Sequence, residues 1–208
     1  MLKKIATTAL AVSALAMATQ ASAMTGVYVN GNLGYAKQSY TTDLTGNDDT
    51  ASDSTFAWEG FLGYNHDMND QWGLGAELGY ADYNEMKWTS GVDSNDTLTN
   101  EQYGWIINAV GTYHADDQFD LFAKAGLIFG KNKLKETDST HSATESETNS
   151  NTQFMTTLGV GYNVMPELAV VLQWEHIFGN KIKDEVDGGD NFQTVNAFMA
   201  GVKYTFEM

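Results

Sequence analysis

The chain has 208 residues and a formal charge of −16, and this composition already limits what it can be. The length suits one domain of ordinary size, and the absence of cysteine excludes a disulfide framework and a thiolate metal site. Residues 24–208 hold nine lysines, no arginine and 27 acids, a formal charge of −18. Such a surface argues against nucleic acid as a partner, because phosphate binding needs clustered lysines and arginines.

The first 23 residues have the pattern of an export signal. Two lysines precede an Ala-rich apolar run over residues 5–18, and the segment ends in Ala21-Ser22-Ala23. A basic start, a short apolar core and an Ala-x-Ala ending predict cleavage after Ala23. A retained membrane helix fits poorly, because the apolar run is too short to span a bilayer comfortably. We therefore expect one exported domain over residues 24–208.

Eight strands are predicted from the alternation of large apolar residues with small or polar ones. They cover about Thr25–Gln38, Thr55–Asn65, Trp72–Tyr83, Gln102–His114, Phe119–Gly130, Phe154–Asn163, Leu168–Glu175 and Ala197–Phe206. In each strand one parity carries the large apolar side chains, and the other carries the charges and most glycines. A water-soluble barrel would place its charges outside. The apolar face is therefore predicted to be the outer one, in contact with lipid.

Aromatic residues stand at both ends of the apolar face. Pairs such as Phe56 with Tyr64 and Trp72 with Tyr80 are separated by about 8 to 10 residues along a strand. At roughly 3.3 Å per residue and a tilt near 40°, this spacing spans on the order of 20–25 Å, the height of the apolar band of an outer-membrane barrel. The general preference of aromatics for strands does not explain their position at strand ends.

The connections alternate between short and long. Short turns are predicted at His66–Gln71, Ala115–Gln118 and Val164–Glu167, and long loops at about Ser39–Ser54, Asn84–Glu101, Lys131–Asn151 and Gly179–Gln193. In a membrane barrel the turns on the side of entry stay short, while loops on the far side can grow. With the N-terminus in the periplasm, the long loops would face outward. The segment 137–151 is nearly all Thr, Ser, Glu and Asn and is predicted to be unordered.

The closing segment contains Gly201, Tyr204 and Phe206, a glycine followed by aromatics three and five residues on. This pattern resembles the C-terminal signal of bacterial outer-membrane barrels, which implies recognition by the barrel-assembly machinery. The segments Val27–Tyr35 and Val164–Glu175 are similar to the first and seventh strands of OmpA-like and OmpX-like barrels. The resemblance covers the whole mature chain. It implies an all-β, eight-stranded antiparallel up-and-down transmembrane β-barrel in the outer membrane of a Gram-negative bacterium.

The chain departs from this family pattern in two places. Met199 stands where the signal usually has a polar residue, and Glu207-Met208 follow the final aromatic. The peptidoglycan-binding domain that follows the barrel in full-length OmpA-type proteins is also absent from the sequence, so a cell-wall tether is not expected.

Five charged side chains fall on the predicted inner face: Glu59, Glu77, Lys124, Glu175 and Lys203. Eight strands enclose a space that side chains just fill. Placing Tyr64 opposite Trp72 sets Glu59 directly opposite Glu77, where like charges are unfavourable and one would be protonated unless a cation intervened. We predict that Lys124 bridges the two glutamates and that the other two charges complete a lumen network. Water-filled, unpaired charges are the alternative. In the resembling family a comparable buried charge cluster closes the barrel interior.

Neither catalysis nor cofactor binding is predicted. Some small outer-membrane barrels modify lipid A with a Ser–His pair, but the four histidines, His66, His114, His141 and His176, show no nucleophile–base–carboxylate pattern. The acidic run 184–190 lacks the spacing of a calcium loop.

The leading interpretation is an integral outer-membrane protein with a structural or surface-interaction role. It would lie in outer-membrane lipid and lipopolysaccharide, with loops open to a host or phage surface ligand. A narrow ion or small-solute channel is the second reading, and a soluble lipocalin-like carrier is the third.

Overall fold

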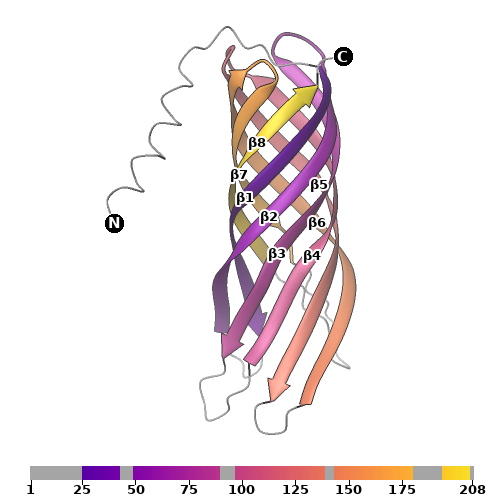
Figure 1. Cartoon of the computed structure of the whole chain (residues 1–208), viewed down its shortest axis with the longest axis vertical. Helices are drawn as coiled ribbons and strands as arrows, with labels where there is room; N and C mark the ends of the chain where they lie inside the picture. Colours follow the sequence, from indigo (N-terminus) through magenta and orange to yellow (C-terminus); the bar gives the residue numbers. More distant parts are fainter. Residues whose placement is uncertain (1–24, 43–48, 90–96, 139–142, 180–193, 207–208) are drawn as a thin grey trace, which may run out of the picture.

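The computed structural model describes residues 25–42, 49–89, 97–138, 143–179 and 194–206, which form one closed barrel. Its strands are β1 Gly26–Thr42, β2 Asp49–Asp67, β3 Trp72–Thr89, β4 Thr97–His114, β5 Phe119–Asp138, β6 Ala143–Met165, β7 Leu168–Ile177 and β8 Thr194–Phe206. Each strand is antiparallel to its neighbours in sequence, and β1 pairs with β8 to close the ring (Figure 1). The predicted fold class is confirmed. Within the described residues, no helix is long and apolar enough to cross a membrane.

The two ends of the barrel differ (Figure 1). At the short-turn end only a few residues join β2 to β3, β4 to β5 and β6 to β7, and β8 ends there beside the start of β1. At the long-loop end the strands extend further than predicted. The pairing of β5 with β6 runs as far as Asp138 opposite Ala143.

The expectation of an unordered segment over 137–151 was therefore wrong for the part described. Residues 143–151 are strand. A strand that extends beyond the bilayer needs no apolar face, because its ladder of backbone hydrogen bonds with β5 supports extended structure in water.

The β2–β3 turn sets a register that differs from the predicted one. Asn69 closes this turn, and its Oδ1 accepts hydrogen bonds from the backbone N–H groups of Gln71 and Trp72, each at 2.9 Å. Tyr64 consequently pairs with Ala76, four residues further along β3 than predicted. A shift by an even number of residues leaves every side chain on its original face. The assignment of faces therefore holds, although the cross-strand partners change.

The outer face carries large apolar side chains, as the alternation predicts. Side chains more than half exposed include Leu33, Leu62, Leu78, Leu158 and Leu172. Aromatic side chains gather at both ends of this surface, with Tyr35 against Phe56 at the long-loop end and Trp72 against Tyr113 at the short-turn end. An apolar belt of this extent is unsuited to water, and it identifies the face that contacts lipid.

The inner face combines glycines with a few large rings. Three rings lie over glycines of the adjacent strand: Tyr28 over Gly63, Phe61 over Gly79 and Phe122 over Gly159. A Cβ atom at any of these glycines would collide with the ring beside it. The glycines therefore provide the volume that the rings occupy, in an interior that eight strands leave just wide enough to be filled.

Candidate functional site

Lys124 on β5 and Glu77 on β3 form an ion pair inside the barrel, with Nζ 2.8 Å from Oε1 and both side chains buried. The Tyr28 hydroxyl donates to the other carboxylate oxygen, Oε2, at 2.8 Å. Asn108 donates from Nδ2 to Oε1 at 2.9 Å. The Lys124 ammonium also lies 4.7 Å from the centre of the Phe61 ring. These contacts join five strands, so the pair is placed to brace the barrel from within.

Glu59 on β2 and Glu175 on β7 occupy a second cluster. The Oε1 atom of Glu59 accepts hydrogen bonds from Asn32 Nδ2 and Gln173 Nε2, each at 2.6 Å. Glu175 accepts a hydrogen bond from the Tyr83 hydroxyl through its own Oε1. Both glutamates are almost completely buried. Among the described residues neither forms an ion pair; besides these amide and phenol donors, the two carboxyl groups lie close enough to interact with each other.

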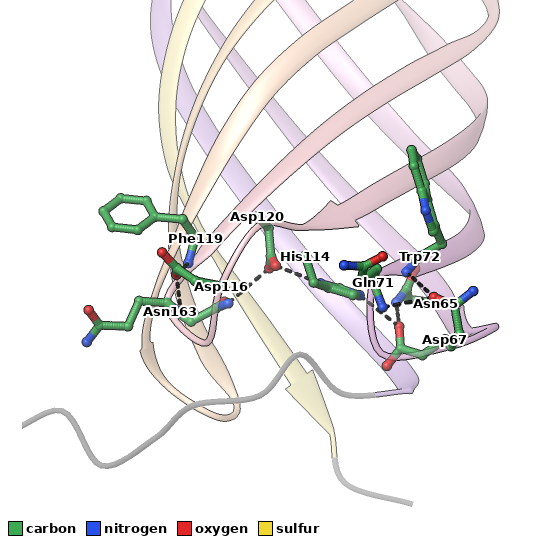
Figure 2. A network of polar contacts seen from close by, with 11 residues as sticks. Asn65, Asp67, Gln71, Trp72, His114, Asp116, Phe119, Asp120 and Asn163 are labelled. Atoms are coloured by element: carbon green, nitrogen blue, oxygen red, sulfur yellow. Dashed lines mark hydrogen bonds and ion pairs between the residues drawn. The ribbon is translucent and has the colours of Figure 1, made fainter.

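A third network closes the short-turn end of the barrel (Figure 2). His114 on β4 lies between two carboxylates, with Nδ1 2.7 Å from Asp120 Oδ1 and Nε2 3.2 Å from Asp67 Oδ1. Asn163 donates to Asp120 Oδ2 at 3.0 Å, and Asn65 donates to Asp67 Oδ1 at 2.8 Å. The network ties β2, β4, β5 and β6 together. Both imidazole nitrogens contact carboxylates, an arrangement that suits bracing of the strands.

A cavity of about 30 Å³ lies between the Lys124–Glu77 pair and this network, bordered also by Asp120 and Lys203. That volume holds about two water molecules and is too small for an organic solute. Lys203 on β8 is half-buried, and its Nζ lies 5.6 Å from the centre of the Tyr28 ring. Within the described residues, no group of three or more His, Asp or Glu side chains is arranged to hold a metal ion.

All five charged residues of the predicted lumen network lie inside the barrel, but their partners across the strands differ from the predicted ones. Glu59 stands opposite Ala81, and Glu77 stands opposite Gly63, so the predicted direct opposition of the two glutamates was wrong. The cause is the β2–β3 turn, which is centred further along the chain than the prediction placed it. Lys124 contacts Glu77 at ion-pair distance. A bridge to Glu59, and a single network through all five charges, remain proposals.

Sequence reasoning missed the neutral donors around these carboxylates. Tyr28, Tyr83 and Gln173 lie on the inner face by parity alone, yet parity does not say which carboxylate each one meets. The Tyr28–Glu77 contact joins residues 49 positions apart, and the Gln173–Glu59 contact joins residues 114 apart. A tyrosine or glutamine that faces inward at the same height as an inward glutamate would have indicated such a donor. Heights can be compared only once the pairing register of the strands is known.

The predicted C-terminal signal is divided between the two faces of β8. Gly201 faces inward opposite Asn32, while the Tyr204 and Phe206 rings face outward and lie 5.0 Å apart. The assembly role of these three residues is still a prediction. The predicted cleavage site at Ala23, together with His141 and the acidic run 184–190, falls outside the described residues.

The chain is similar in sequence to known proteins. Residues 7–206 match the family model described as "Outer membrane protein beta-barrel domain". Outer membrane protein P5 of Haemophilus influenzae is 28% identical over 160 residues, which is 74% of this chain and 44% of that protein. The chain therefore spans less than half the length of this relative.

Two solved structures share the fold. Ail, the attachment invasion locus protein of Yersinia pestis, aligns with a TM-score of 0.50 and 18% identity over 88% of this chain and 100% of that one. Neisserial surface protein A aligns with a TM-score of 0.54 and 13% identity over 87% of this chain and 97% of that one. At such identities the likeness concerns the fold alone.

Proposed function

Because the chain belongs to the outer membrane protein beta-barrel family and lies in the outer membrane, we propose that its barrel is a rigid scaffold for surface interactions. The observation that supports this role is the contrast between the two faces. The outside is an apolar belt suited to lipid, and the inside is occupied by braced polar side chains from Asp67 and His114 up to Glu175 and Tyr83. A barrel built in this way leaves recognition to its outer connections.

The charge of those connections indicates which partners they favour. The segments 39–54, 84–101, 131–151 and 179–193 together hold 16 acidic side chains and 6 lysines. Ail of Yersinia pestis has been solved in complex with the heparin analogue sucrose octasulfate. A polyanion of that kind would be repelled by the acidic connections of the present chain. We expect a neutral or cationic partner on a host cell or phage.

Loop exchange tests the scaffold role. The intact protein, and a variant whose four long connections are replaced by short turns, are displayed on cells and compared for host-cell adhesion and phage adsorption. A heat-modifiable gel band confirms that both barrels are folded. The proposal predicts that binding disappears in the exchanged variant. If the partner is cationic, its binding to the intact protein also weakens with salt. Binding that survives the exchange would place recognition elsewhere.

A narrow channel is the second candidate, and the cavity beside Lys203 is the observation that favours it. The Phe61 ring and the Lys124–Glu77 pair lie across the interior next to that cavity. We therefore expect no stable conductance steps for the purified protein in planar bilayers. Reproducible steps that change in size when Lys124 is replaced by Met would favour the channel instead.

We also propose that the protein is not an enzyme. Incubation with labelled lipopolysaccharide tests this, and we expect no modified product.

We propose that the barrel-assembly machinery recognises the residues Gly201, Tyr204 and Phe206. Replacing Phe206 with Ala should then slow insertion in cells and leave unassisted folding into vesicles unchanged. Equal slowing in both settings would point to a folding role alone.

A further inference from the structure

A row of polar side chains crosses the outer face at the long-loop end. Cross-strand pairing places Thr156 beside His176, His176 beside Asn196, Asn196 beside Lys37, and Lys37 beside Ser54. The row, which we call the outer polar row, therefore runs over the adjacent strands β6, β7, β8, β1 and β2. None of these five described residues is a carboxylate, although the chain as a whole is strongly acidic.

The outer polar row lies directly above an apolar row. Two residues nearer the bilayer centre, the same strands present Leu158, Trp174, Phe198, Tyr35 and Phe56 in register. Phe198 and Tyr35 are 69% and 68% exposed, the largest values among the exposed apolar side chains of the described residues. Aromatic side chains of this kind mark the level of lipid headgroups. On β8 and β1 the outer polar row is thus at the height where a headgroup would meet the barrel, whereas on β6 and β7 the apolar belt continues two residues further, to Phe154 and Phe178.

Two members of the row are held in place. His176 Nδ1 lies 2.8 Å from Asn196 Oδ1, and the imidazole ring packs edge-on against Phe178 with ring centres 4.4 Å apart. Lys37 is exposed on the next strand, in register with Asn196. Neighbouring strands are about 4.8 Å apart. The Cα atoms of Lys37, Asn196 and His176 therefore lie within about 10 Å of one another.

The other outward-facing lysine with a described side chain has different surroundings. Lys131 on β5 stands beside Tyr103, and Tyr103 stands beside Asp82 in the next strand pair. A carboxylate thus shares the height of Lys131, whereas none shares the height of Lys37 among the five described residues of its row. The remaining lysines with described side chains, Lys124 and Lys203, lie inside the barrel. Lys37 is therefore the exposed cation best placed for an anionic lipid.

We propose that Lys37, His176 and Asn196 bind a phosphate group of lipid A, the membrane anchor of lipopolysaccharide, while its acyl chains pack on Phe198 and Tyr35. A lysine ammonium donates charge-assisted hydrogen bonds to phosphate oxygens, and basic side chains at the membrane boundary attract anionic headgroups. A chain with a formal charge of −18 over residues 24–208 would otherwise be repelled by the phosphates of the outer leaflet. The inference rests on the proposed orientation, with the long-loop end outside.

Lipid titration tests the proposal. The protein is purified from outer membranes, stripped of bound lipid, and placed in phosphatidylcholine vesicles without divalent cations. The temperature at which the compact gel band is lost is followed as the mole fraction of bisphosphorylated lipid A increases in both leaflets. We expect Lys37→Gln to raise the half-saturating mole fraction about tenfold, and Lys131→Gln, the matched control, to leave it unchanged. Dephosphorylated lipid A and inorganic phosphate should have no effect.

Three outcomes would overturn the site. These are equal responses of Lys37→Gln and the unmodified protein, equal losses for the two lysine variants, or full stabilisation by inorganic phosphate or by lipid A without phosphate. Because lipid A is present in both leaflets, the result does not depend on which end of the barrel faces outward. It is also independent of any ligand of the loops, so failure here and failure of the loop-exchange experiment are distinguishable.

Discussion

Replacing Lys124 with Met tests whether the buried ion pair with Glu77 braces the barrel. Removing one partner of a buried pair costs roughly 3–5 kcal/mol, because the other charge is left buried. Glu77 would keep its hydrogen bonds from Tyr28 at 2.8 Å and Asn108 at 2.9 Å. We therefore expect a loss near the lower end, about 3 kcal/mol of the free energy of unfolding. That corresponds to a decrease of about a hundredfold in the folding equilibrium constant.

The assay is urea unfolding in phosphatidylcholine vesicles, followed by tryptophan fluorescence and by the compact gel band before boiling. A double-mutant cycle with Glu77→Gln supplies the control, because the amide oxygen of Gln can accept from Asn108 while its NH2 group donates to the Tyr28 hydroxyl oxygen. The variant with both changes has no unpaired buried charge and should be about 2 kcal/mol more stable than Lys124→Met alone. Unchanged stability of the single variant, or a coupling energy near zero, would refute the bracing role.

Three further predictions, which involve five substitutions, use the same urea titration. Gly201→Ala would drive a Cβ atom into the backbone of β1 and should cost about 1–3 kcal/mol. Gly31→Ala faces open space and should leave the midpoint unchanged; equal effects of the two would contradict the packing argument. His114→Ala removes the link between two carboxylates at the short-turn end and should cost about 2 kcal/mol. An unchanged midpoint would show that this network does not stabilise the barrel. Leu158→Lys, at the middle of the apolar belt, should cost about 2–4 kcal/mol, and Ser54→Lys, beyond the belt, about 0–1 kcal/mol. Similar penalties would contradict the placement of the bilayer.

Much of the architecture is readable from the sequence because it depends on local alternation. The parity of a side chain on a strand decides its face, whichever residue it pairs with. Leu33, Leu62 and Leu158 could therefore be placed on the lipid side, and Glu59 and Lys124 on the inside, before any pairing was known. The alternation of short and long connections predicts the order of neighbouring strands equally well, since adjacent antiparallel strands need only a turn between them.

Only the tertiary structure decided which inner side chains meet. The Asn69 turn shifted β3 by four residues against the expected register, which kept every face and separated Glu59 from Glu77. The link from Asp67 through His114 to Asp120 joins three strands, and the Gln173–Glu59 contact joins residues 114 positions apart in the sequence. Alternation has a period of two residues and repeats identically for every even shift. It therefore determines the direction of a side chain, while turn geometry and ring closure determine its partner.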